Sequence, residues 1–274
     1  MNHRLPTLDA AAIEAAAAHL ATVRPAYASI LGFYGPVYAA QLESAAETSP
    51  AEIDIDDSLL RMKSKAGFAL IEPADFPIDM PAARRLLIKI CRIAAASSED
   101  IAHTAQALFE AMQSDRVADD CFAEALSENG GVPSLAGQLG VPADMLGLLF
   151  YLAVKPSVEK GARQLADRPA AHLEAPNDCP VCGRPPVIGE LDHDGKQWLH
   201  CGLCWHRWPV ARLTCPFCDN RDSGSLAYAF SESEPEYRVN LCDRCRRYVK
   251  VVEQVASLHL DMLAAEKGYR RIDD

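Results

Sequence analysis

The sequence lacks a long hydrophobic run. A membrane-spanning helix needs about 20 mostly apolar residues, and the longest uncharged stretch, residues 25–42, is interrupted by Gly35 and Pro36. We expect a buried helix pair that is broken near these two residues. The Ala-rich segment near the N-terminus carries Asp9 and Glu14, which favour an ordinary helix over a secretory signal. The sequence therefore predicts a soluble, cytoplasmic protein with no stable membrane insertion.

Positive charge is also in short supply. Lysine and arginine total 27 against 38 aspartates and glutamates, which gives a formal net charge of −11. The first 178 residues carry 24 acidic and 14 basic side chains, whereas the remainder carries 14 and 13. A chain this acidic is poorly suited to bind a phosphate backbone, so we predict no nucleic-acid partner. The uneven charge and the length of 274 residues indicate two differently composed domains.

Catalytic motifs are missing from the first two thirds of the chain. The glycines between residues 130 and 140 lack the spacing and the lysine of a phosphate-binding loop. The aspartates between residues 54 and 57 lack the glycine and the distal glutamate of a calcium loop. Cys91 and Cys121 lie in apolar helical patterns, so we expect both to be buried small hydrophobic residues. Nothing here predicts an enzyme.

The same two thirds show helical periodicity. Apolar residues recur at helical spacing from Thr7 to about Asp167, and Ser98 is placed as an N-cap before one such segment. The predicted helices cover residues 8–23, 25–47, 58–66, 82–96, 98–114, 116–128 and 143–166. We therefore predict an all-α domain over residues 1–166, followed by a Pro-containing linker at 167–178.

Eight of the ten cysteines form four Cys-x-x-Cys pairs, here called the first to fourth knuckles. These are Cys179/Cys182, Cys201/Cys204, Cys215/Cys218 and Cys242/Cys245. Two thiolates at this spacing reach one metal ion, and the turn between them points backbone N–H groups at the sulfurs. Without a secretory context, such pairs favour metal sites over disulfides. A thiol–disulfide enzyme, the rival hypothesis, generally uses one pair at a helix N-terminus.

The spacing between knuckles predicts how they pair. Eighteen residues separate Cys182 from Cys201, and 23 separate Cys218 from Cys242, enough for a hairpin in each case. Residues 205–214, between the two middle knuckles, are long enough for a further strand. This favours sequential pairing, in which the first and second knuckles bind one ion and the third and fourth bind another. The alternative is an interleaved arrangement.

Aromatic and basic residues surround the knuckles, and each group has two interpretations. Three tryptophans and two histidines lie between residues 198 and 208, either as packing around a metal site or as a partner-binding surface. His200 is adjacent to Cys201, but four cysteines already complete a tetrahedral set. A basic cluster at residues 244–250 is explained by a solvated strand face that offsets thiolate charge.

These motifs resemble a known family, the formate dehydrogenase accessory proteins called FdhE. The resemblance rests on the knuckle sequences with their flanks at residues 179–187, 199–208 and 242–250, and on the run Ala-Ser-Leu-His-Leu-Asp at 256–261. It is specific from residue 179 to about 265 and only architectural over the helical part. Arg246 departs from the pattern, because a glycine often follows the fourth knuckle.

The resemblance implies a fold and a function. The fold is α+β, with the all-α domain at 1–166, the linker, and two tandem rubredoxin-like or zinc-ribbon modules at 179–213 and 214–274, the second ending in a short helix. The function is a cytoplasmic assembly factor that binds the catalytic subunit of respiratory formate dehydrogenase and is not itself an enzyme. Two iron ions per chain are implied, held by Cys179, Cys182, Cys201 and Cys204 and by Cys215, Cys218, Cys242 and Cys245.

Several alternatives stay open. Cys₄ sites suit zinc as well as iron, and spacing does not choose between them. A zinc-ribbon protein that binds nucleic acid in transcription and a rubredoxin-like electron carrier are the competing functions. A homodimer is also compatible with the sequence.

Overall fold

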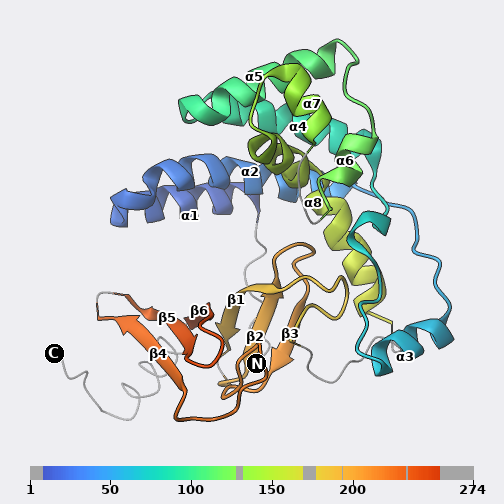
Figure 1. Ribbon diagram of the computed structural model, residues 1–274. Coiled ribbons are helices and arrows are strands. Elements are labelled where there is room, and N and C mark those ends of the chain that lie inside the picture. Colours follow the sequence, from blue (N-terminus) through green and yellow to red (C-terminus); the bar gives the residue numbers. More distant parts are fainter. Residues whose placement is uncertain (1–8, 128–131, 169–176, 193, 233, 254–274) are drawn as a thin grey trace. The chain divides into compact units, whose positions relative to one another are not determined.

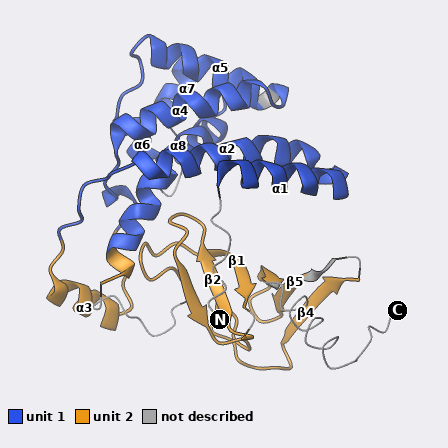
Figure 2. Ribbon diagram, turned by 180° about the vertical axis from the view of Figure 1, so that it is seen from behind, with its two compact units in different colours: residues 1–54, 72–164 blue, residues 55–71, 165–274 orange. Residues whose placement is uncertain are grey.

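The computed structural model of the protein consists of two compact units, each built from separate stretches of the chain (Figure 2). The structure describes residues 9–127, 132–168, 177–192, 194–232 and 234–253. The first unit, here the helical unit, comprises residues 1–54 and 72–164, and the second, the sheet unit, comprises residues 55–71 and 165–274. The fold is α+β, as the sequence predicted.

The helical unit follows the predicted periodicity (Figure 1). Its helices are α1 (Ala10–Val23), α2 (Ala28–Glu47), α4 (Met80–Ala95), α5 (Glu99–Gln113), α6 (Asp120–Glu124), α7 (Pro133–Leu139) and α8 (Ala143–Ala166), with single 3₁₀ turns at Pro25–Tyr27 and Pro73–Asp75. Asp79 caps α4, because its carboxylate accepts a hydrogen bond from the backbone N–H of Ala82 (3.1 Å). The same carboxylate also accepts one from the backbone N–H of Ser49 (2.7 Å), which lies outside the helix. These bonds lower the pKa of Asp79, the Ser49 bond most.

Large apolar side chains from four helices form the core of the helical unit. Ile90 of α4, Leu108 of α5, Phe122 of α6 and Phe150 of α8 are fully buried. The rings of Phe122 and Phe150 meet edge to face, with their centroids 4.9 Å apart. These contacts bring the short helix α6 onto the long helix α8.

One predicted helix break is wrong. The structure carries α2 without interruption through Gly35 and Pro36, and the chain turns instead just before the helix, at the first 3₁₀ turn. A Cβ atom at Gly35 would lie 2.7 Å from the Cβ of Ala17, so α1 and α2 approach closely at this point. The amide of Gln41 donates to the carbonyl of Leu152 in α8 at 2.7 Å. Packing on both sides keeps the helix continuous despite the missing N–H of the proline.

Two further differences concern the segment before α8. The predicted helix at 116–128 is shorter in the structure, where α6 spans five residues. Residues 133–139, which no predicted helix covered, form α7. Pro133 occupies the first turn of α7 and Gly140 ends it with φ +68°, the usual positions of these residues at helix termini.

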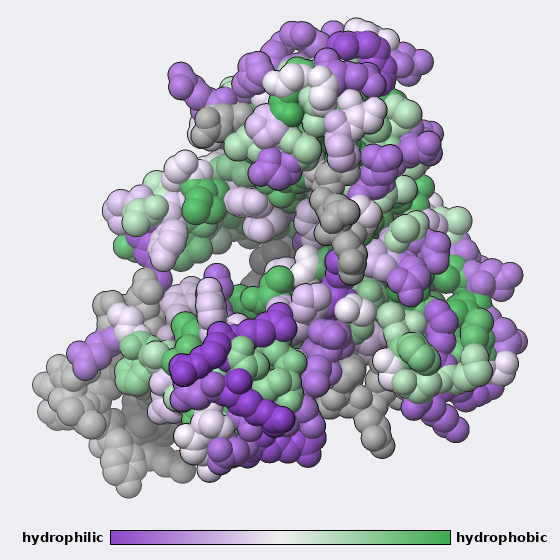
Figure 3. Space-filling view, viewed as in Figure 1, coloured by the Kyte–Doolittle hydropathy of each residue, from purple (hydrophilic) through white to green (hydrophobic). Residues whose placement is uncertain are grey.

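Among the described residues, no single helix combines the length and the apolar composition needed to cross a membrane. The pair α7 and α8, bent by 117°, satisfies that test together by length and composition alone. Leu146, Leu149 and Phe150 of α8 are fully buried. Hydrophilic side chains are prominent along the outer border of the helical unit in Figure 3.

The described residues of the sheet unit form one separate helix and six strands. They are α3 (Asp57–Lys65), β1 (Pro186–Leu191), β2 (Gln197–Cys201), β3 (Arg207–Val210), β4 (Leu226–Ser231), β5 (Glu234–Cys242) and β6 (Tyr248–Glu253). The hairpins β1–β2 and β4–β5 lie where the knuckle spacing predicted them, and β3 occupies part of the segment between the middle knuckles. The predicted C-terminal helix and most of the predicted linker lie outside the described residues.

The two modules share one continuous sheet, which the sequence analysis did not predict. The strand order is β3-β2-β1-β6-β5-β4, and neighbouring strands are antiparallel except for the parallel pair β1 and β6. In that pair Gly189 lies beside Val251, where a Cβ atom would come within 3.0 Å of the valine side chain. Each module contributes its three strands in the same order, so the second module repeats the first along the sheet.

The unit boundaries differ from the predicted domain bounds. Residues 55–71, which include α3, belong to the sheet unit, although the sequence analysis assigned them to a helical domain at 1–166. An ion pair between Asp57 and Arg168 links α3 to the chain beyond α8. Helical periodicity identifies a helix but does not indicate which core it joins.

Candidate metal centres

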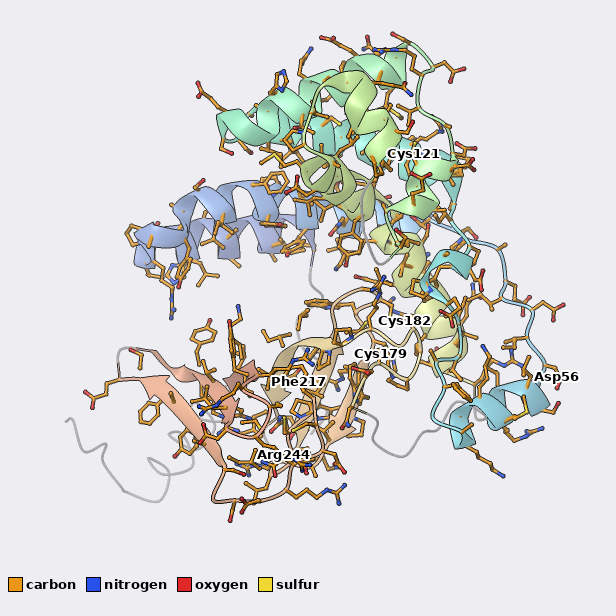
Figure 4. All side chains as sticks on the ribbon, viewed as in Figure 1. Asp56, Cys121, Cys179, Cys182, Phe217 and Arg244 are labelled. Atoms are coloured by element: carbon orange, nitrogen blue, oxygen red, sulfur yellow. The ribbon has the colours of Figure 1, made fainter. Side chains whose placement is uncertain are left out.

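The first and second knuckles bring four sulfurs together. Cys179, Cys182, Cys201 and Cys204 form the first cluster, in which the sulfur–sulfur distances include 3.6 Å (Cys179 to Cys204), 3.3 Å (Cys182 to Cys201) and 3.5 Å (Cys182 to Cys204). All four residues are buried. Cys179 and Cys182, at the start of the module, are labelled in Figure 4.

The third and fourth knuckles form the second cluster. Cys215, Cys218, Cys242 and Cys245 have sulfur–sulfur distances of 3.6 Å (Cys215 to Cys245) and 3.8 Å (Cys218 to Cys242). Cys215 and Cys242 are buried, whereas Cys218 and Cys245 are half-buried. The cysteines are thus grouped in chain order, as sequential pairing predicts, and not interleaved.

Both clusters fit a tetrahedral metal ion. Four sulfurs at about 2.3 Å from one ion lie about 3.8 Å from each other, close to the separations observed in each cluster. A disulfide would need a separation of about 2.05 Å, and all eight cysteines are free thiols. The eight candidate ligands of the sequence analysis are therefore positioned to hold two ions per chain. That they bind metal stays a prediction.

One backbone geometry recurs in all four knuckles. The N–H of the first cysteine donates to the carbonyl five residues later, at 2.8 to 3.1 Å; the pairs are Cys179 to Arg184, Cys201 to His206, Cys215 to Asn220 and Cys242 to Arg247. The residue after the second cysteine always has positive φ: Gly183 +73°, Trp205 +59°, Asp219 +52° and Arg246 +59°. Arg246, the departure noted from the family pattern, thus adopts the same turn as Gly183.

A segment from the beginning of the sheet unit covers the first knuckle. The N–H of Leu70 donates to the carbonyl of Pro180 at 3.3 Å, and the N–H of Ile71 donates to that of Val181 at 3.0 Å. A Cβ atom at Gly183 would lie 3.2 Å from Ala69. No described segment pairs in this way with the third knuckle. The cover explains why the first cluster is more deeply buried, and sequence analysis missed it because it lies over 100 residues away.

The thiols of the first cluster share their protons unequally. Hydrogen bonds from neighbouring thiols, Cys179 first, lower the pKa of Cys201, and the backbone N–H groups of Leu203 and Cys204 lie 3.3 and 3.4 Å from its sulfur. Burial raises the pKa of Cys179, and the hydrogen bond with Cys179 raises the pKa of Cys204. Negative charge therefore collects on Cys201.

In the second cluster, Cys242 is the thiol whose pKa is lowered. Burial opposes its ionisation, but hydrogen bonds from the backbone N–H of Cys245 and from the Asn220 amide outweigh this effect and lower its pKa to about 6. The Asn220 amide lies 3.6 Å from the sulfur and 2.8 Å from the Ser225 hydroxyl. Burial raises the pKa of Cys215 to about 12. Asn220 is buried and was not identified from the sequence, because one asparagine after a knuckle carries no distinctive pattern.

The tryptophans and histidines of the first module serve mainly in packing. Trp208 is buried and stacks on His206, and burial lowers the pKa of that histidine. His200 lies outside the first cluster, because its Nε2 is 2.7 Å from the carboxylate of the buried Glu190. Trp205 is the exposed tryptophan, at 45%. These contacts favour packing over a partner-binding surface for most of this group.

The remaining candidate cysteines lie in the helical unit. Cys91 is buried, and desolvation raises its pKa to about 12, as expected of a small core residue. Cys121, marked in Figure 4, is only half-buried, so the expectation of full burial fails there. It lies in the short helix α6 rather than in the longer amphipathic helix that the sequence predicted.

Comparison with known proteins identifies the first module directly. Residues 178–212 match the family model described as "FdhE, central domain", a segment that contains the whole first cluster. Over this segment the chain is similar to the FdhE family. An FdhE homologue from Aquifex aeolicus is 32% identical over 114 residues, which cover 35% of this chain and 40% of that protein. One from Pseudomonas aeruginosa is 33% identical over 115 residues, covering 34% and 37%.

The relationship is local in sequence and extends further in fold. The protein FdhE of Escherichia coli O1:K1 is 33% identical over 109 residues, 34% of this chain and 35% of that protein. The aligned part thus spans about a third to two fifths of each of these FdhE relatives. The crystal structure of the FdhE protein from Pseudomonas aeruginosa superimposes with a TM-score of 0.61 and 21% identity, covering 96% of this chain and 92% of that one. That likeness shows a shared fold.

Proposed function

We propose that this protein is an accessory factor of formate dehydrogenase that binds the catalytic subunit during maturation in the cytoplasm. The observation that supports it most directly is the match of the first module, with its four cysteines, to the FdhE central domain. The related fold supports the same assignment for the whole chain. The factor acts on its client by binding.

Each cluster holds one metal ion in this proposal, iron in the first instance and zinc as the alternative. Four protein thiolates occupy all four coordination positions of a tetrahedral ion, so none is left open for a substrate. That arrangement suits an ion that fixes the shape of a surface or gates it by a change of redox state, and it supports a protein that is not itself an enzyme.

Deletion of the gene from a host that uses respiratory formate dehydrogenase tests the function. We expect dehydrogenase activity to be lost and to return when this chain is supplied, while the purified chain alone oxidises no formate. The catalytic subunit should co-purify with the tagged chain. Normal dehydrogenase activity in the deletion strain, in the absence of a second copy of the gene, would refute the proposal.

Metal analysis of anaerobically purified protein tests the cofactor. Elemental analysis should give two ions per chain, and ferric iron bound by four thiolates should add a visible absorption that zinc cannot. A colourless protein with two equivalents of zinc would show that the sites hold zinc and not iron. Fewer than one ion per chain, in protein with a native circular dichroism spectrum, would contradict both sites.

A further inference from the structure

The second module contains a pocket that the proposed metal chemistry leaves unused. Its volume is about 440 Å³, within the range of small-ligand sites. Side chains of β4 and β5, the third knuckle and the segment before it form the walls, and Cys215 and Cys242 of the second cluster are among the lining residues. We call it the arginine pocket, after Arg212, Arg238 and Arg247 in its lining.

The charge of the arginine pocket has one sign. Its three arginines come from three separate places: the segment before the third knuckle, strand β5, and the end of the fourth knuckle. Among the described residues, no aspartate or glutamate lines it, although acidic residues outnumber basic ones in the chain as a whole. Asp178 interacts with Arg247 through space without forming a described ion pair. The pocket is therefore a local positive site in an acidic protein.

Aromatic rings hold two of the guanidinium groups. The guanidinium carbon of Arg247 lies 3.9 Å from the centre of the Phe217 ring, and that of Arg238 lies 5.8 Å from the centre of the Tyr228 ring. Phe217 is labelled in Figure 4. Stacking on a ring restrains a guanidinium while its N–H groups remain in plane to donate. Arg212 and Arg247 form no ion pair with any described residue.

An apolar surface adjoins the positive site. The rings of Tyr228 and Phe230 on β4 stack with their centres 6.1 Å apart, and they are 64% and 58% exposed. β4 is an edge strand of the sheet. We propose that the arginine pocket binds a short acidic segment of a partner protein, with carboxylates paired to the arginines and apolar neighbours packed on Tyr228 and Phe230. The inference rests on the proposed function, since the partner is taken to be the client.

Two other roles for the arginines fit the structure less well. Nucleic-acid binding uses open aromatic faces on which bases stack, whereas the Arg247 guanidinium already lies on a face of Phe217 and the chain carries a formal net charge of −11. Balancing thiolate charge would favour arginine N–H groups on the sulfurs. Neither Arg212 nor Arg247 donates to a knuckle sulfur among the described residues, and the described side-chain donor to Cys242 is Asn220.

Two capped hexapeptides test the pocket on the full-length metallated protein. One alternates leucine with aspartate and the other alternates leucine with asparagine, so that size and apolar content match. We expect the aspartate peptide to bind and the asparagine peptide to bind at least about tenfold more weakly, because charge-assisted hydrogen bonds are lost. Equal affinities would overturn the proposal. The proposal would also be overturned if a ten-nucleotide single-stranded DNA bound more tightly than the aspartate peptide and its binding depended on the same arginines.

The chain offers matched control variants. Arg247→Gln and Arg212→Gln should each weaken binding of the aspartate peptide about tenfold. Arg246→Gln and Arg221→Gln should leave it unchanged, because these arginines lie outside the pocket and pair with Asp243 (3.4 Å) and Asp219 (3.1 Å). Each variant is compared at two ions per chain. Equal losses in pocket and control variants would show a diffuse charge effect and refute the site.

Co-purification separates this inference from the proposed function. If the catalytic subunit co-purifies with the wild type and equally with the double variant Arg212→Gln/Arg247→Gln, the pocket is refuted and the function stands. If the aspartate peptide binds but no catalytic subunit is captured, the function fails and the carboxylate site stands. Loss of the subunit from the double variant, with retention by Arg246→Gln, supports both.

Discussion

The two clusters have the same knuckles and different surroundings. All four cysteines of the first are buried and the segment at residues 69–71 pairs with its first knuckle, whereas two cysteines of the second are half-buried and a pocket adjoins them. Since the knuckle backbone is alike in all four turns, the ligands themselves do not cause the difference. The same repeat thus stands in two environments, so an ion held by the first cluster would stabilise the fold and an ion held by the second would be more accessible.

Removing ligands from each cluster gives the largest expected effect. Cys179→Ser with Cys182→Ser, and Cys215→Ser with Cys218→Ser, should each leave one ion per chain. The first pair should also lower the melting temperature of the sheet unit more, since binding of a structural ion contributes directly to folding and these sulfurs are in its core. Elemental analysis and thermal circular dichroism measure both quantities. Loss of both ions from either variant, with the helices intact, would contradict independent sites.

Chelation compares the two ions in one molecule. A chelator should remove the ion of the second cluster at least about tenfold faster, a difference of ~1.4 kcal/mol in barrier, because two of its sulfurs are half-buried. Release should steepen below about pH 6. The pKa of Cys242 without a bound ion is about 6, so below that pH one more proton competes with the metal for its sulfur. Biphasic release followed by a metal-sensitive dye measures this, and a single phase would remove the distinction.

Local patterns predicted the knuckles but not their environment. The Cys-x-x-Cys pairs and the distances between them located the hairpins and the sequential grouping. The parallel pairing of β1 with β6 joins residues about 60 positions apart, and no periodicity encodes such a contact. The cover over the first knuckle was missed for the same reason. Helix bounds followed the pattern except at Pro36, where tertiary packing outweighs the local preference, and before α8, where α6 is shorter than predicted and α7 was not predicted.

Opening the cover should make the first cluster behave like the second. Leu70 is 1% exposed and its N–H pairs with the first knuckle. Leu70→Ala should destabilise the sheet unit by about 2–5 kcal/mol, the usual cost of emptying a buried leucine site, and should speed release of the first ion. Met62→Ala is the control, because Met62 is 61% exposed. Unfolding by denaturant, followed by tryptophan fluorescence, gives the stability. Unchanged release from a destabilised variant would show that the cover does not protect the ion.

The turn after each knuckle gives the smallest effect and tests whether the four turns are equivalent. Arg246 has φ +59°, and glycine adopts this conformation without the strain of a Cβ atom. Arg246→Gly should therefore stabilise the second module by up to about 1 kcal/mol, offset in part by the greater freedom of glycine in the unfolded chain. Gly183→Ala should act in the opposite direction, because it adds strain at φ +73° and places a methyl 3.2 Å from Ala69. Denaturant midpoints at fixed metal content measure both. If both variants shift the midpoint in the same direction, the turns are not equivalent, and the departure at Arg246 marks a real difference between the modules.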